Sequence, residues 1–120
     1  MKNLWTTINV KNMDESVKFY SEILSLPVEK RYKPTDDMEI TFLGSGETKF
    51  ELIYNSAIKD IEYTGNVSTG FAVESVDECI KYLNEKDIPV VAGPFEPAPH
   101  IKFFFVNDPN GYKIQLVEER

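Results

Sequence analysis

The chain has little of what several common kinds of active site need. Its 120 residues include a single cysteine, Cys79, and a single histidine, His100. One cysteine cannot form an internal disulfide, which agrees with a reducing compartment. With one histidine and one cysteine, a Ser-His-Asp or Cys-His catalytic set is not expected, and no glycine-rich loop of the kind that cradles phosphates occurs. The common nucleophilic and phosphoryl-transfer sites are therefore not expected.

Long apolar runs and clustered basic residues are also missing. No stretch approaches a membrane span, and the segment from Met1 to Val10 lacks the features of a signal peptide. We therefore expect a cytoplasmic protein with no membrane partner. Lysine and arginine number 13 against 20 acidic residues, a net charge of −7, so nucleic acid is not an expected partner. Hydrophobic residues make up 42% of the chain, enough for the core of one domain, residues 1–120.

The most informative feature present is an internal repeat. At an offset of 63 residues, the segment Ile8–Tyr20 aligns with Phe71–Leu83. At an offset of 64 residues, Thr48–Asn55 aligns with Tyr112–Glu119. The change by one residue indicates a small insertion in a loop. The chain therefore divides into two modules of about sixty residues. Modules of this size are not expected to fold independently with certainty, so the two should share one core or pack as a pair.

Each module, approximately residues 1–60 and 61–120, has the pattern of a βαβββ unit. Opening strands are expected at Leu4–Val10 and Ser68–Val73, each followed by a helix with a capping box, Asn12 with Glu15 and Ser75 with Glu78. The remaining strands are expected at Val28–Tyr32, Glu39–Leu43 and Lys49–Tyr54, then at Val90–Ala92, Ile101–Val106 and Tyr112–Val117. Prolines predict a stiff loop over Gly93–His100, and Asn55–Val67 is the expected link between modules.

Alternation along the strands separates an apolar face from a mixed face in each module. In the fourth strand Phe50 and Leu52 point towards the helix, and Glu51 points the other way. The same alternation assigns four residues to the mixed faces: Trp5, Glu51, Ser68 and Gln115. A mixed concave face is where a ligand would sit; the alternative is a solvated sheet face.

Three segments resemble the vicinal-oxygen-chelate superfamily, which includes glyoxalases, bleomycin resistance proteins and dioxygenases. They are INVKNMDESVKFYSEILSL from Ile8, KFELIYN from Lys49 and VNDPNGYKIQLVEE from Val106. The resemblance covers nearly the whole chain. It implies an α+β fold in which two tandem βαβββ modules form a curved mixed sheet with a cleft. It also implies a homodimer, and leaves open whether the cleft lies within one chain or is shared by two.

Enzymes of this superfamily hold a divalent metal with one residue from each of four strands. Carried over, those positions fall on Trp5, Glu51, Ser68 and Gln115, where the enzymes typically have His, Glu, His and Glu. The repeat supports this placement, since it relates Trp5 to Ser68 and Glu51 to Gln115. An indole N–H only donates, and one carboxylate with one amide falls short of the roughly three good ligands of a catalytic zinc. We therefore expect no metal cofactor.

The resemblance places Phe103 and Phe105 in the cleft with Trp5 and Glu51, and Glu39 is a further candidate. Aromatic rings beside a carboxylate suit a flat or partly cationic ligand. The superfamily's metal-free members bind drugs and sequester them, so a metal-independent binder of a small organic molecule is the first hypothesis. The alternative role for these rings is to fill the cleft or a subunit interface.

Two further hypotheses remain open. One is a lyase, isomerase or dioxygenase that uses a weak metal at Glu51 and Gln115, or Glu51 as a metal-free general base. The other is a non-catalytic interaction domain. His100 lies outside the four strands that carry the ligand positions. It is either an acid/base or ligand contact at the cleft rim, or an exposed loop histidine.

Overall fold

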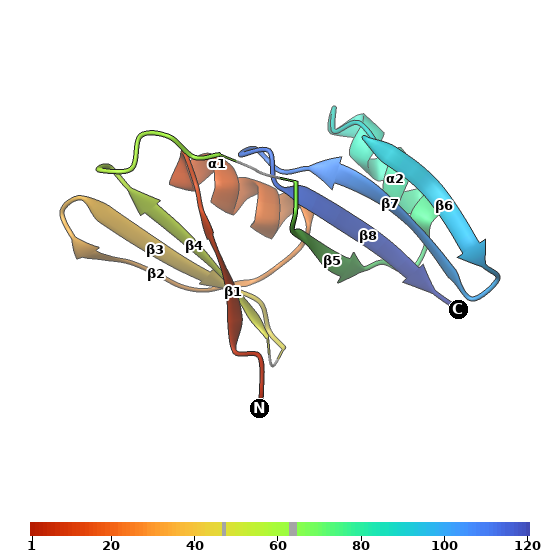
Figure 1. The fold of residues 1–120 in the computed structure, drawn as a ribbon, viewed down its shortest axis with the longest axis horizontal. Helices are drawn as coiled ribbons and strands as arrows, with labels where there is room; N and C mark the ends of the chain where they lie inside the picture. The colour runs from red at the N-terminus through yellow and green to blue at the C-terminus, as the bar shows by residue number, and fades with distance from the viewer. Residues whose placement is uncertain (47, 63–64) are drawn as a thin grey trace. The chain divides into compact units, whose positions relative to one another are not determined.

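A computed structural model describes residues 1–46, 48–62 and 65–120. These form two compact units, Met1–Glu62 and Tyr63–Arg120, and each contains one βαβββ module (Figure 1). The α+β class and the tandem modules are therefore confirmed. That both units form a single domain stays a prediction. The expected link between the modules includes residues 63 and 64, which lie outside the described residues.

The same order of elements occurs twice. The first unit has β1 (Trp5–Asn9), α1 (Met13–Lys18), the π-helical turn η1 (Phe19–Ile23), β2 (Val28–Thr35), β3 (Met38–Leu43) and β4 (Lys49–Asn55). The second unit has β5 (Ser68–Ala72), α2 (Val76–Glu85), β6 (Ala92–Ala98), β7 (Ile101–Asn107) and β8 (Lys113–Glu119). Neither described helix is long and apolar enough to cross a membrane.

The strands divide into two four-stranded sheets, β1-β4-β3-β2 and β5-β8-β7-β6, one in each unit. In both sheets the opening strand runs parallel to the closing strand, and the other pairs are antiparallel. A parallel pair needs a crossover connection, and the helix lies within it. The repeat seen in the sequence is therefore a repeat of topology.

Each sheet buries one face against its own helix (Figure 1). In the first unit the Tyr20 ring lies 4.9 Å from the Phe50 ring, and the Thr41 hydroxyl contacts the Met13 sulfur at 3.3 Å. Fully buried side chains under the two helices include Tyr20, Leu43, Leu52, Leu83, Phe104, Ile114 and Leu116. The opposite side of each sheet, which carries Glu51 or Gln115, is called the open face below.

Both helices begin where the sequence predicts. The side chains of Asn12 and Ser75 accept hydrogen bonds from the backbone N–H of Glu15, at 3.0 Å, and of Glu78, at 3.2 Å. The buried residues of the first helix and of the turn that continues it are Met13, Ser16, Phe19 and Tyr20. The π-helical turn that continues α1 changes which side chains face the sheet.

The predicted loop over Gly93–His100 and the predicted strand Val90–Ala92 are wrong. Residues Ala92–Ala98 form β6, the outer strand of the second sheet, and two register shifts interrupt its pairing with β7. Proline is tolerated on an outer strand because the missing N–H is not needed there. Gly93 has φ +94, and a Cβ there would lie 3.2 Å from backbone atoms of β7, so the bend requires glycine.

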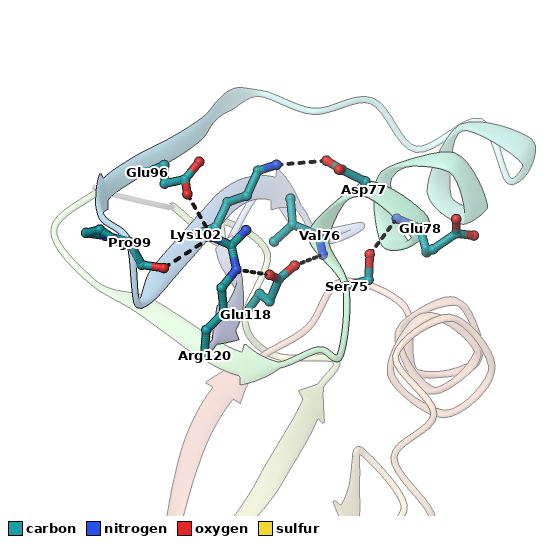
Figure 2. A network of polar contacts seen from close by, with 9 residues as sticks. All are labelled: Ser75, Val76, Asp77, Glu78, Glu96, Pro99, Lys102, Glu118 and Arg120. Carbon is teal, nitrogen blue, oxygen red and sulfur yellow. Dashed lines mark hydrogen bonds and ion pairs between the residues drawn. The ribbon is translucent and has the colours of Figure 1, made fainter.

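A polar network ties the end of the chain to the start of α2 (Figure 2). The Glu118 carboxylate accepts the backbone N–H of Val76 at 2.8 Å and a hydrogen bond from the Arg120 guanidinium. Arg120 also donates to the Glu96 carboxylate at 2.7 Å. Glu118 therefore places a negative charge at the helix end where backbone N–H groups need acceptors.

These contacts make stability depend on pH. The pKa of Glu118 is lowered, mainly because its carboxylate accepts the Val76 N–H and also binds Arg120. The carboxylate thus stabilises the fold above the unfolded pKa, near 4.5, and this contribution is lost as pH falls through the folded pKa. We expect Glu118→Gln to melt below the wild type at neutral pH, with the difference closing below roughly pH 4. Thermal unfolding across this range, with Glu119→Gln as the charge-matched reference, measures it; a constant difference would contradict the assignment.

Candidate functional site

The open face of the first unit carries a row of side chains that crosses all four strands. Thr7 of β1 pairs with Glu51 of β4, Glu51 pairs with Phe42 of β3, and Phe42 pairs with Lys30 of β2. Directly paired residues project to the same side of a sheet. Trp5 lies two residues before Thr7 and therefore shares this face. Trp5 and Glu51 thus lie on one face, as alternation predicts.

Trp5 and Glu51 line one hollow of about 470 Å³, a volume within the usual range for a small-molecule site. Its lining residues are Leu4, Trp5, Glu29, Lys30, Tyr32, Phe42, Lys49 and Glu51. The ring of Trp5 meets the ring of Phe42 edge to face, with centroids 5.4 Å apart. Phe42 is almost fully buried, whereas Trp5 is 48% exposed, so the indole presents surface to a ligand.

Glu51 is buried, with 9% exposure, although it is a carboxylate. Its Oε1 accepts a hydrogen bond from the Thr7 hydroxyl at 2.6 Å. Among the residues that the structure describes, no lysine, arginine or histidine nitrogen lies within 4.0 Å of it. Burying a carboxylate is costly unless its oxygens are satisfied. Glu51 therefore keeps acceptor capacity for a donor inside the hollow.

Two lysines line the same hollow and differ in their partners. Lys49 is neutralised by Glu29, with Nζ and Oε2 2.7 Å apart, and it also donates to the Gly44 carbonyl at 2.9 Å. The hydrogen bond from Lys49 lowers the pKa of Glu29. Lys30 has no such carboxylate among the described residues; its Nζ lies 4.9 Å from the centre of the Phe42 ring and 5.7 Å from that of Tyr32. Lys30 is a residue of the hollow that was not predicted from the sequence.

The open face of the second unit is more apolar. Gln115 pairs with Gly70 and Phe105, and Ser68 pairs with Lys113. Three phenylalanines form a ring cluster with centroids 5.5 to 6.5 Å apart: Phe95, Phe103 and Phe105. The Lys113 ammonium lies 4.5 Å from the centre of the Phe105 ring. Phe103, Phe105, Ser68 and Gln115 thus share one face, and Phe95 joins them from a segment predicted to be a loop.

Two candidates lie away from these open faces. His100 is exposed in the turn between β6 and β7. It adjoins Ile101, which lies four residues before Phe105, roughly 13 Å along the strand. The suggested place of Glu39 in the cleft is wrong: it pairs with Tyr54 on the helix side of the sheet and forms an ion pair with Arg31 at 3.2 Å. The role of His100 stays a prediction.

The sequence and the fold both match known proteins. The sequence profile of the Glyoxalase/Bleomycin resistance protein/Dioxygenase superfamily matches residues 3–116. The chain belongs to this superfamily. It is similar to the lactoylglutathione lyase of Escherichia coli O157:H7, 27% identical over 100% of this chain and 94% of that protein. A probable lactoylglutathione lyase of Vibrio cholerae is 30% identical over 98% of this chain and 90% of that protein.

A solved structure from the same superfamily supports the fold. The trypanothione-dependent glyoxalase I of Leishmania major superposes with a TM-score of 0.84 and 31% identity, covering 99% of this chain and 87% of that one. The predicted superfamily is thereby confirmed. The activity does not follow from it, because one fold hosts several chemistries.

The side chains at the four positions that the resemblance assigns to metal ligands do not fit a catalytic divalent cation. Trp5 offers an aromatic face and a donor-only N–H, and its ring is packed against Phe42. Ser68 offers a neutral hydroxyl, Gln115 an amide and Glu51 the single carboxylate. Among the described residues, no three His, Cys, Asp or Glu side chains come together closely enough to hold a metal ion.

Proposed function

We propose that the chain binds a small organic molecule in the hollow of its first unit, without a resident divalent metal. The observation that carries this proposal is the buried Glu51 carboxylate, which accepts a hydrogen bond from Thr7 and faces a hollow lined with aromatic rings. A flat group stacks on the exposed Trp5 ring, and an ammonium or another donor of the ligand binds Glu51. The ligand is thus flat and partly cationic.

The nucleophilic side chains favour binding of the ligand over its chemical transformation. Cys79 lies on α2 and is partly buried, and burial raises the pKa of its thiol. A raised pKa keeps the thiol protonated and unreactive. The hydroxyl of Thr7 donates to Glu51, so it orients the carboxylate that the ligand meets.

We also propose a homodimer. Large apolar side chains remain exposed in both units, among them Leu4, Val67 and Phe95, at 54%, 70% and 45%. Where such side chains form one contiguous patch, they mark an association site. Sedimentation velocity should give twice the mass of the 13.8 kDa chain; a monomer at all concentrations would remove this part of the proposal.

The binding proposal is tested with a flat cation. Trp5 is the single tryptophan, so a ¹⁵N-labelled sample gives one indole N–H signal located in the hollow. We expect 2-naphthylmethylamine to shift this signal saturably, with the same dissociation constant in EDTA and with added Zn²⁺ or Ni²⁺. An unmoved signal would remove the proposed site. Binding that requires a metal and is lost in Glu51→Ala would overturn metal independence.

A lyase activity is the second candidate, because the relatives named as lactoylglutathione lyases align with nearly the whole chain. Here the buried Glu51, oriented by Thr7, would act as general base. Formation of lactoylglutathione from glutathione and the matching α-keto aldehyde by the purified chain, lost in Glu51→Gln, would establish it. If Glu51→Gln turned over as fast as the wild type, Glu51 would be removed as the base. Absence of turnover together with saturable naphthylmethylamine binding favours the binder.

A further inference from the structure

The hollow of the first unit holds two opposite charges that do not neutralise each other. Lys49 and Glu29 form one ion pair. The other two charged side chains are Glu51 and Lys30. Glu51 accepts a hydrogen bond from the Thr7 hydroxyl, and the Lys30 ammonium lies over the rings of Tyr32 and Phe42. Among the described residues, neither has an ionic partner within 4.0 Å.

These two charges lie at fixed places on the sheet. Lys30 pairs with Phe42, and Phe42 pairs with Glu51, so the charges are two strands apart, roughly 10 Å between backbones. The Phe42 ring lies between them, and the Lys30 ammonium is 4.9 Å from its centre. The floor of the hollow is therefore aromatic in the middle, positive at one side and negative at the other.

We propose that the hollow selects an amphoteric ligand: a flat aromatic molecule with an anionic group for Lys30 and an ammonium for Glu51. This inference rests on the proposed function and adds the anionic group to it. An ammonium over a ring face still has N–H donors to offer a carboxylate. The chain has 20 acidic and 13 basic residues, so its net charge repels anionic ligands. A lysine without a carboxylate partner in the hollow opposes this repulsion locally and attracts an anionic group.

Three naphthalene derivatives test the inference by calorimetric titration. They are 6-(aminomethyl)-2-naphthoate, which carries both charges, 2-naphthylmethylamine, which carries the positive one, and 2-naphthoate, which carries the negative one. Charge-assisted hydrogen bonds set the expected scale, so the amphoteric compound should bind about ten-fold more tightly than either relative. Equal affinity of the amphoteric compound and the amine would overturn the inference and leave the proposed function standing. No binding by any of the three would overturn both.

Variants assign each charge to its residue. Lys30→Gln should bring the affinity for the amphoteric compound down to that for the amine, and leave the amine unaffected. Glu51→Gln should bring it down to that for 2-naphthoate. Lys33→Gln, a substitution on the same strand but outside the residues that line the hollow, is the matched control and should bind as the wild type does. If Lys30→Gln and Lys33→Gln behave alike, the anionic group is not bound by Lys30.

Discussion

Replacing Phe104 by alanine is expected to lower the free energy of unfolding by about 4 kcal/mol. Phe104 is fully buried in β7, where it pairs with Leu116 beneath α2. Alanine removes the ring and leaves a cavity that neighbouring backbone cannot fill, since sheet pairing holds it in place. Because a domain of this size is stable by only about 5–15 kcal/mol, the loss is a large fraction of the total.

Its neighbour on the same strand is the matched control. Phe103 projects to the open face, where its ring lies 5.5 Å from Phe95 and 5.8 Å from Phe105. Phe103→Ala therefore loses partly exposed ring contacts, worth about 1 kcal/mol. Urea unfolding followed by circular dichroism measures both variants. Equal losses would mean that the two rings are not on opposite faces, which would contradict the sheet register.

Alternation and repetition made the sheet faces predictable from the sequence. The repeat aligned Trp5 with Ser68 and Glu51 with Gln115, and the period of two residues in a strand then assigned each to a face. The turn at Asp108 likewise depends on residues close together in the sequence: its carboxylate accepts the N–H of Asn110 at 2.8 Å, and Gly111 has φ +97. These features depend on neighbours in sequence or on the period alone.

Lys30 could not be assigned in this way. Val28 pairs with Leu43, but Lys30 pairs with Phe42 instead of Thr41, because the register shifts between Val28 and Lys30. A bulge of this kind moves the residues after it to the other face. Since the shift depends on the partner strand, alternation counted from Val28 gives the wrong side for Lys30. A charged residue on an exposed outer strand is also typical of ordinary solvated surface, so the sequence gives no reason to place it in a site.

The outer strand β6 was missed for a related reason. Pro94 and Pro97 lower the strand signal, and only the position at the edge of the sheet makes them acceptable. Phe95 consequently reads as a loop residue, although its ring joins the cluster with Phe103. The sequence thus predicts the opening and inner strands better than β2 and β6, the two outer strands that supply Lys30 and Phe95 to the open faces.

Replacing Trp5 by alanine is expected to weaken binding of 2-naphthylmethylamine by about thirty-fold, while the stability of the fold changes little. The indole is half exposed and contacts Phe42 at its edge, so its removal opens no buried cavity comparable to that left by Phe104→Ala. It does remove the largest flat surface of the hollow, on which the naphthalene ring stacks. We therefore expect Trp5→Ala to lower the affinity for the ligand with little change in stability, and Phe104→Ala to lower the stability.

Trp5→Phe is the conservative variant, because it keeps an aromatic face of smaller area and should recover most of the affinity. Calorimetric titration gives the dissociation constants, and urea unfolding of the same samples gives their stability. Wild-type affinity in Trp5→Ala would show that the ligand lies elsewhere, and the hollow would lose its assignment. A loss of stability as large as that of Phe104→Ala would instead make Trp5 part of the core. Loss of affinity with the fold intact, and its recovery in Trp5→Phe, would establish that the aromatic ring at position 5 is the stacking surface of the hollow.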